Sequence, residues 1–188
     1  MRIYWLTILL AFGGSLPLAD QANAPASTIE WQSSRKLVWD DFKRAVPAAS
    51  SAVGFFYDAT LHCPSPKLEF SVKAYFDPNK SWVRPEMKSD ELLRHEQLHF
   101  DLAELYARKF RGEMSEFKVP CGRATPTQDA INVETKSRID RLFDERLKAL
   151  LHEQNRYDSQ TANGLDVARQ KQWEESVKRR LNVDFGRK

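Results

Sequence analysis

The sequence predicts an α+β fold in which a small antiparallel sheet comes first and two or three long helices follow. Three observations lead to this prediction: an alternating apolar segment over residues 68–76, a helical pattern of leucines from residue 92 onward, and two further helical patterns near the end of the chain. Strict alternation is typical of a half-buried antiparallel strand, whereas leucines three or four residues apart mark the buried side of a helix. The strands are expected within about residues 29–85 and the helices within about residues 89–182.

The sheet is expected to have about three strands. Residues 68–76 alternate apolar and polar side chains without a break. Residues 52–61 are rich in aromatic and β-branched residues and end at a Cys-Pro-Ser-Pro turn. A third apolar segment, at residues 37–39, precedes two aspartates and supplies the remaining candidate strand.

The first long helix is expected to begin after Ser89, because serine is a favoured N-cap and Asp90 and Glu91 would complement the helix dipole. Apolar residues at helical spacing continue to Phe110, and the pattern ends by Pro120.

Two more helices are expected. Thr125, Pro126 and Gln128 form an N-terminal signature, in which threonine is the cap, proline takes the first helical position and glutamine closes a capping box. The second helix should run to about Arg156. After a turn at the Asn163-Gly164 pair, a third helix carries Trp173, Val177 and Leu181 at a spacing of four residues.

Length and charge exclude several classes of protein. The chain has 188 residues, of which 41% are hydrophobic and 29% charged, so residues 27–188 fit one packed domain. The formal net charge of +3 is too balanced for a dedicated nucleic-acid-binding protein. No repeat of solenoid length is visible.

Residues 1–26 are expected to be a secretory signal peptide. Arg2 precedes an apolar run at residues 3–12, which is too short to span a bilayer, and small residues allow cleavage after Ala26 or after Ala24. An uncleaved membrane anchor is the alternative. Export predicts a periplasmic or secreted protein with no stable membrane insertion once the segment is removed.

Export also bears on the state of the cysteines, because disulfide bonds form in oxidising compartments. Cys63 and Cys121 are the two in the chain, and an even number in an oxidising compartment favours one disulfide bond. Two buried free thiols are the alternative. A cysteine-bound metal is disfavoured because the chain has no Cys-x-x-Cys pair.

The sequence His95-Glu96-Gln97-Leu98-His99 is the main chemical motif. Residues four apart lie on one side of a helix, so His95 and His99 can bind a single zinc ion. Glu96 is turned about 100° away and would act as a general base on a water bound to that ion. The alternative is a pair of ordinary histidines that bind no metal.

Around this motif the chain resembles the bacterial family of predicted secreted zinc-dependent proteases known as domain of unknown function 922. The resemblance covers about residues 39–173. Its most specific part is the run from Leu92 to Arg108. The family's other short motifs match at Trp39-Asp40-Asp41-Phe42, Ser81-Trp82-Val83, Tyr157-Asp158, Thr161, Gly164 and Gln170-x-x-Trp173.

The resemblance implies a zincin-like metallopeptidase with its two histidines on the first long helix. The chain differs from the family at one position of the closing motif, where the family has a histidine and this chain has Asn163. A histidine there would be an obvious third zinc ligand, and an asparagine amide is a poorer one.

Three residues remain candidates for the third ligand. Asp158 is a hard, charged donor and ranks first, Asn163 ranks second and His152 third. Asp158 could equally be an ordinary helix-terminal or turn residue. Tyr157 is expected either to donate a hydrogen bond to the oxyanion of a tetrahedral intermediate, or to be a core tyrosine.

The leading functional prediction is a periplasmic or secreted zinc peptidase that hydrolyses peptide bonds in a peptide or protein substrate. The active helix should run below a cleft bordered by a sheet edge, where a peptide could add as a strand. A zinc-binding envelope module that binds a protein or cell-wall partner without cleaving it is the second hypothesis. A plain interaction domain is the third.

Overall fold

A computed structural model describes residues 27–44, 51–62, 67–118 and 128–184, and these contain one three-stranded sheet and three α-helices. The α+β prediction is therefore confirmed. The elements, in chain order, are β1 (Ile29–Glu30), β2 (Val53–His62), β3 (Lys67–Phe76), α1 (Asp90–Ser115), α2 (Gln128–Thr161) and α3 (Val167–Asp184).

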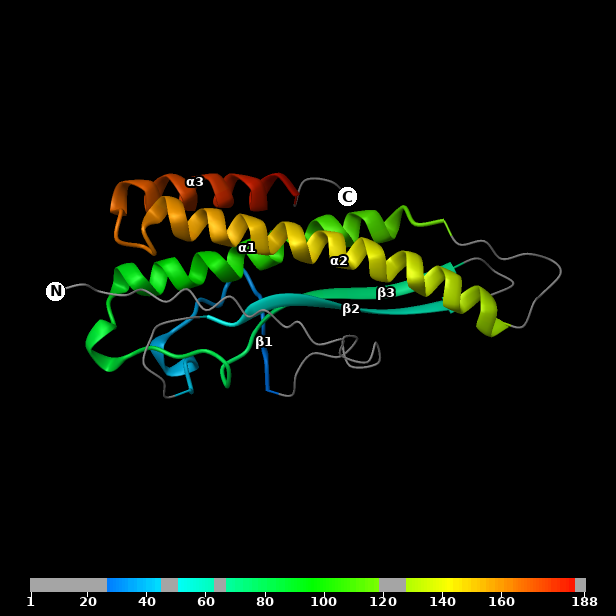
Figure 1. Ribbon diagram of the computed structural model, residues 1–188, viewed down its shortest axis with the longest axis horizontal. Helices are drawn as coiled ribbons and strands as arrows, with labels where there is room; N and C mark the ends of the chain where they lie inside the picture. Colours follow the sequence, from blue (N-terminus) through cyan, green and yellow to red (C-terminus); the bar gives the residue numbers. More distant parts are fainter. Residues whose placement is uncertain (1–26, 45–50, 63–66, 119–127, 185–188) are drawn as a thin grey trace.

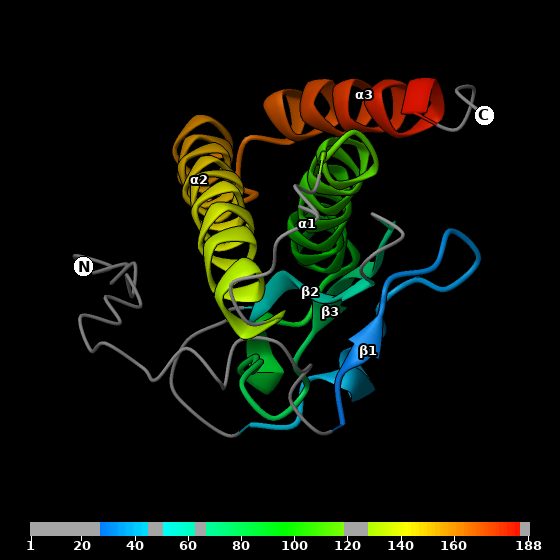
Figure 2. The ribbon, with the colours of Figure 1, turned by 90° about the vertical axis from the view of Figure 1, so that its right-hand side faces the viewer.

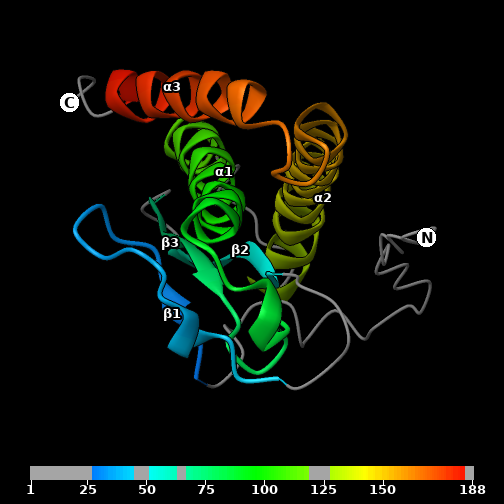
Figure 3. The same ribbon diagram turned by 90° about the vertical axis from the view of Figure 1, so that its left-hand side faces the viewer.

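The elements lie in three layers (Figure 1). The sheet forms the first layer, α1 and α2 lie side by side on one of its faces, and α3 covers α1 on the side away from the sheet, as Figures 2 and 3 show from the two ends. Helix α1 is thus the central element, which explains why residues on almost every side of it are buried.

The sheet has the order β1-β3-β2 and is antiparallel throughout. Strand β3 pairs with the full length of β2, whereas β1 pairs only with Tyr75 and Phe76. Val72 and Ala74 are buried below the helices while Ser71 and Lys73 are exposed, so the alternation predicted for residues 68–76 is confirmed.

The third strand is not where the apolar segment at residues 37–39 placed it. Strand β1 comes earlier, and Trp39–Asp41 forms a short 3₁₀ helix. The backbone N–H of Leu37 donates to the Gln97 side chain at 2.8 Å, and that of Val38 donates to the Asp41 carboxylate at 3.0 Å. Because side chains accept these N–H groups, the segment has no need of a neighbouring strand.

Helix α1 begins as predicted, since the Ser89 side chain accepts a hydrogen bond from the backbone N–H of Leu92 at 3.1 Å. Aromatic contacts hold the helix against the sheet. The rings of Phe100 and Phe76 lie 6.1 Å apart, and those of Phe110 and Tyr57 lie 5.4 Å apart. These contacts fix the rotation of α1 about its axis and therefore the direction in which its polar residues point.

Helix α2 continues to Thr161, five residues beyond the predicted end at Arg156. Asp158 is consequently part of the helix rather than of the segment that follows it. The turn at Asn163-Gly164 and the third helix are present, and Trp173, Val177 and Leu181 are buried as their spacing predicted.

Several predictions fall on residues outside the described ranges. They concern the signal peptide at residues 1–26, the Cys63–Cys121 disulfide and the capping residues Thr125 and Pro126. Within the described part of the chain, no helix combines the length and apolar character needed to cross a membrane.

Candidate metal centre

His95 and His99 lie on the side of α1 that faces α2, and both are buried, with 3% and 8% of their surface exposed. Their positions, one helical turn apart, give the two imidazoles a common direction. The Nε2 atoms are 3.3 Å apart and the two rings are nearly perpendicular, at 89°.

Asp158, on the last turn of α2, completes a cluster of three donors. Its Oδ1 lies 3.2 Å from His95 Nε2 and 2.9 Å from His99 Nε2. Among the described residues, these three form the group of histidine and acidic side chains that could hold a metal ion. Of the three third-ligand candidates, the one ranked first from sequence is the one brought to the histidines.

The spacing of the donors fits tetrahedral zinc. Zinc bonds of about 2.0–2.1 Å in tetrahedral geometry require neighbouring donors to be about 3.3 Å apart. The three separations, 2.9, 3.2 and 3.3 Å, are close to this value. In addition, Asp158 Oδ1 is buried and lies against both imidazole nitrogens, so the three donor atoms face a common space that a cation could occupy.

The charges of the cluster suit a cation. Burial alone would raise the pKa of the Asp158 carboxyl and lower that of His99. Hydrogen bonding and attraction between the two groups reverse both effects, so the pKa of Asp158 lies well below its usual range and that of His99 lies above. Asp158 is therefore ionised at neutral pH, and a proton on His99 would compete with a metal ion.

Glu96 is buried beside the cluster, with 4% of its surface exposed. It is turned about 100° from His95 on α1, so it is not one of the three clustered donors. Its negative charge contributes to the raised pKa values of His99 and Tyr157, which places it within electrostatic range of the site.

The Tyr157 ring packs on both histidines. Its ring stacks on His95 at 4.6 Å and meets His99 edge-on at 5.0 Å. The side chain is fully buried, and its hydroxyl donates to Gln170 Oε1 at 2.6 Å. Burial and the bond to Gln170 are what a core tyrosine would show, and the oxyanion-binding role of the hydroxyl stays a prediction.

The turn between α2 and α3 brings backbone directly against His95. Ala162, Asn163 and Gly164 all have positive φ angles, of 49°, 55° and 84°. A Cβ atom at Gly164 would lie 3.1 Å from both Cβ and Cγ of His95. The glycine therefore serves two needs at once, the left-handed backbone and the close approach to the imidazole.

Replacing Gly164 by alanine should disturb this contact. We expect Gly164→Ala to lower the free energy of unfolding by roughly 1–2 kcal/mol from backbone strain alone, and to weaken zinc binding by displacing His95. Thermal unfolding and zinc titration would measure the two effects. Gly112→Ala, on α1, is the matched control. A Cβ at Gly112 would have no neighbouring atom within 4 Å, and alanine favours the helix over glycine, so this variant should be more stable than the wild type. Equal behaviour of the two variants would contradict this account.

Asn163 and His152 occupy different surroundings. His152 is exposed on α2 and is not in the cluster. Asn163 is half-buried in the left-handed turn, where its backbone N–H donates to the Asp158 carbonyl at 2.8 Å. Asparagine is a favoured residue for such a turn because it tolerates positive φ.

Asn163→Gly separates the two interpretations of this position. Glycine keeps the left-handed backbone but removes the side-chain amide. If Asn163 is a turn residue, zinc affinity measured by competition with a chromophoric chelator should be unchanged. A loss comparable with that of Asp158→Ala would instead identify the amide as a ligand.

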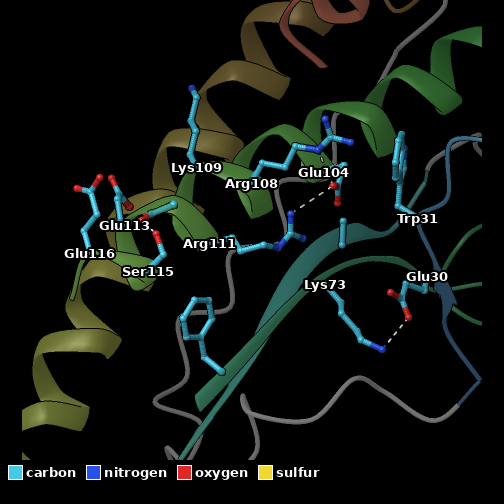
Figure 4. Close-up of a pocket in the computed structure, with 13 residues that line it drawn as sticks. Glu30, Trp31, Lys73, Glu104, Arg108, Lys109, Arg111, Glu113, Ser115 and Glu116 are labelled. Carbon is cyan, nitrogen blue, oxygen red and sulfur yellow. Dashed lines mark hydrogen bonds and ion pairs between the residues drawn. The ribbon is translucent and has the colours of Figure 1, made fainter. Parts of the chain in front are cut away.

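A hollow of about 880 Å³ lies elsewhere, between the C-terminal half of α1 and the part of β3 that extends beyond its pairing with β1 (Figure 4). Arg111 lies in it and donates to the Val72 carbonyl on that part of β3 at 2.7 Å, and Glu30 pairs with Lys73 at 2.9 Å. Positions 104, 108 and 111 lie on roughly the opposite side of α1 from the histidines. The hollow beside this sheet edge is therefore not the expected cleft over the metal cluster.

Gln170 is a described residue whose contact with His95 the sequence did not indicate. Its side-chain oxygen lies 3.2 Å from His95 Nδ1, and the residue is 5% exposed. The sequence shows it only as part of the Gln170-x-x-Trp173 pair. Its place just after the turn at Gly164, which packs on His95, is the feature that could have indicated a contact.

Comparison with known proteins identifies the family of this chain. The profile of a bacterial protein family of unknown function, DUF922, matches residues 22–164. Searches of curated proteins and of solved structures give no match. The matched region covers most of the chain and includes the three clustered donors, so the chain belongs to the DUF922 family.

Proposed function

We propose that this protein is a zinc-dependent peptidase that is exported and acts on a peptide or protein substrate. The observation that carries the proposal is the set of His95 Nε2, His99 Nε2 and Asp158 Oδ1, spaced 2.9–3.3 Å from one another with Glu96 next to His95. Two imidazoles and one carboxylate from the protein are the donor set of several catalytic zinc sites, in which a fourth position stays open for water or substrate.

A bound zinc ion would polarise a substrate carbonyl and lower the pKa of a coordinated water towards 7. Glu96 would accept a proton from the attacking water and deliver it to the nitrogen of the departing amine. His95 and His99 would hold the ion through Nε2, and the ionised Asp158 would offset one of its two positive charges. Tyr157 would keep the two rings in place by stacking on one and meeting the other edge-on.

A zinc-binding module without peptidase activity is the second candidate. It is favoured by the burial of both histidines and by the engagement of the Tyr157 hydroxyl with Gln170, which would leave that hydroxyl unavailable to stabilise an oxyanion. Such a module would use the metal to hold α1 and α2 together and would bind a protein or cell-wall partner through another surface.

Cleavage of a denatured protein substrate distinguishes the two. A peptidase should cut the substrate, lose the activity when a chelator removes the metal, and regain it when zinc is restored. A module that only binds zinc would show no cleavage under any of these conditions. The same preparation would show by its intact mass whether residues 1–26 have been removed, as export predicts.

A further inference from the structure

The Gln170 side chain on α3 joins three groups around the metal cluster. Its Oε1 lies 3.2 Å from His95 Nδ1 and accepts a hydrogen bond from the Tyr157 hydroxyl at 2.6 Å. Its Nε2 donates to Glu174 Oε1, one turn further along α3, at 3.1 Å. The amide therefore links the far side of the His95 ring to a partly exposed carboxylate.

The chemistry of these partners sets the direction of every hydrogen bond. An ionised carboxylate only accepts, so Glu174 turns the amide nitrogen of Gln170 towards itself. The amide oxygen must then face His95, and an oxygen there requires the ring nitrogen Nδ1 to carry the proton. When the ring is neutral, as a zinc ligand must be, the opposite nitrogen, Nε2, then has its lone pair directed at the space shared with His99 and Asp158.

We propose that Gln170 is a positioning residue that holds His95 in the tautomer and ring orientation needed to bind zinc, with Glu174 fixing the direction of the Gln170 amide. The inference rests on the proposed zinc site. A group that hydrogen-bonds the second nitrogen of a ligating histidine commonly changes metal affinity 10–100-fold. Here the group is a neutral amide on a separate helix, so α3 contributes to the site although it supplies none of the three clustered donors.

Gln170→Met tests the proposal, because methionine fills a similar volume but provides no good acceptor for His95 or Tyr157. Zinc affinity, measured by competition with a chromophoric chelator, should fall about 10–100-fold. Gln172→Met is the matched control, since Gln172 is exposed on the same helix and contacts Arg169 rather than the site. The thermal midpoint of each metal-free variant would reveal a general loss of packing.

Exchanging the side chains of Gln170 and Glu174 should preserve zinc binding. In the double variant Gln170→Glu with Glu174→Gln, position 170 still accepts from His95 and Tyr157, and position 174 still forms the bond between the two residues. This variant should bind zinc at least as tightly as the wild type. Nitrogen-15 NMR of the zinc-loaded wild type and double variant should also show a protonated Nδ1 on His95.

The outcomes separate this inference from the zinc proposal itself. If the wild type binds zinc and both Gln170→Met and the control bind it equally well, Gln170 has no positioning role. An unprotonated His95 Nδ1 in the zinc-loaded wild type would overturn it as well. If the wild type binds no zinc, the proposed metal site fails and the positioning role fails with it.

Discussion

Asp158→Ala is expected to lower zinc affinity by at least about 100-fold, since loss of an outer hydrogen-bonding group alone can cost that much and Asp158 lies against both histidines. The remaining donors would be two neutral imidazoles, which leave the charge of a divalent ion unbalanced. Competition with a chromophoric chelator measures the effect.

His152→Ala is the control for this experiment. It removes a potential zinc ligand from the same helix, but the residue is exposed and lies outside the cluster, so its zinc affinity should equal that of the wild type. If His152→Ala weakens binding and Asp158→Ala does not, the assignment of the third ligand is wrong.

Glu96→Gln should keep the metal and remove the activity. Because Glu96 is not among the clustered donors, zinc affinity should stay near the wild-type value. Glutamine cannot accept a proton, so cleavage of a denatured protein substrate should fall at least about 100-fold, the lower end of the range for a lost general base.

Glu91→Gln provides the comparison for Glu96. The two substitutions remove the same charge from the same helix, but Glu91 is exposed and pairs with Arg94 at 3.2 Å. Its activity should be unchanged. An active wild type together with an equally active Glu96→Gln variant would exclude Glu96 as the general base.

Local patterns in the sequence predicted most of the fold. Ser89 as a cap and the alternation in residues 68–76 each depend on contacts within a few residues or on one buried face, and both are confirmed. Strand β1 could not be found this way, because two residues show no periodicity and pair with β3 from more than forty residues away. The extra turn of α2 begins at Tyr157, which is buried against His95 of α1 and Trp173 of α3, and such packing is also a tertiary effect.

The site residues also differ in whether local sequence spacing or helix packing brings them together. His95 and His99 share one helix, so their spacing alone placed them together. Asp158 could be ranked by its chemistry but not located, because its position depends on how α2 packs beside α1. Gln170 is uncharged, and its spacing from Trp173 suggests only helix packing. Its contact with His95 depends on how α3 crosses α1, which the sequence does not show.

Zinc titration of the purified, metal-free protein shows whether the His95, His99 and Asp158 cluster holds a metal ion. We expect one tightly bound zinc ion per chain in the wild type, and loss of that ion when either His99 or Asp158 is replaced by alanine. A wild-type protein that binds no zinc, or a stoichiometry that survives both substitutions, would contradict this expectation.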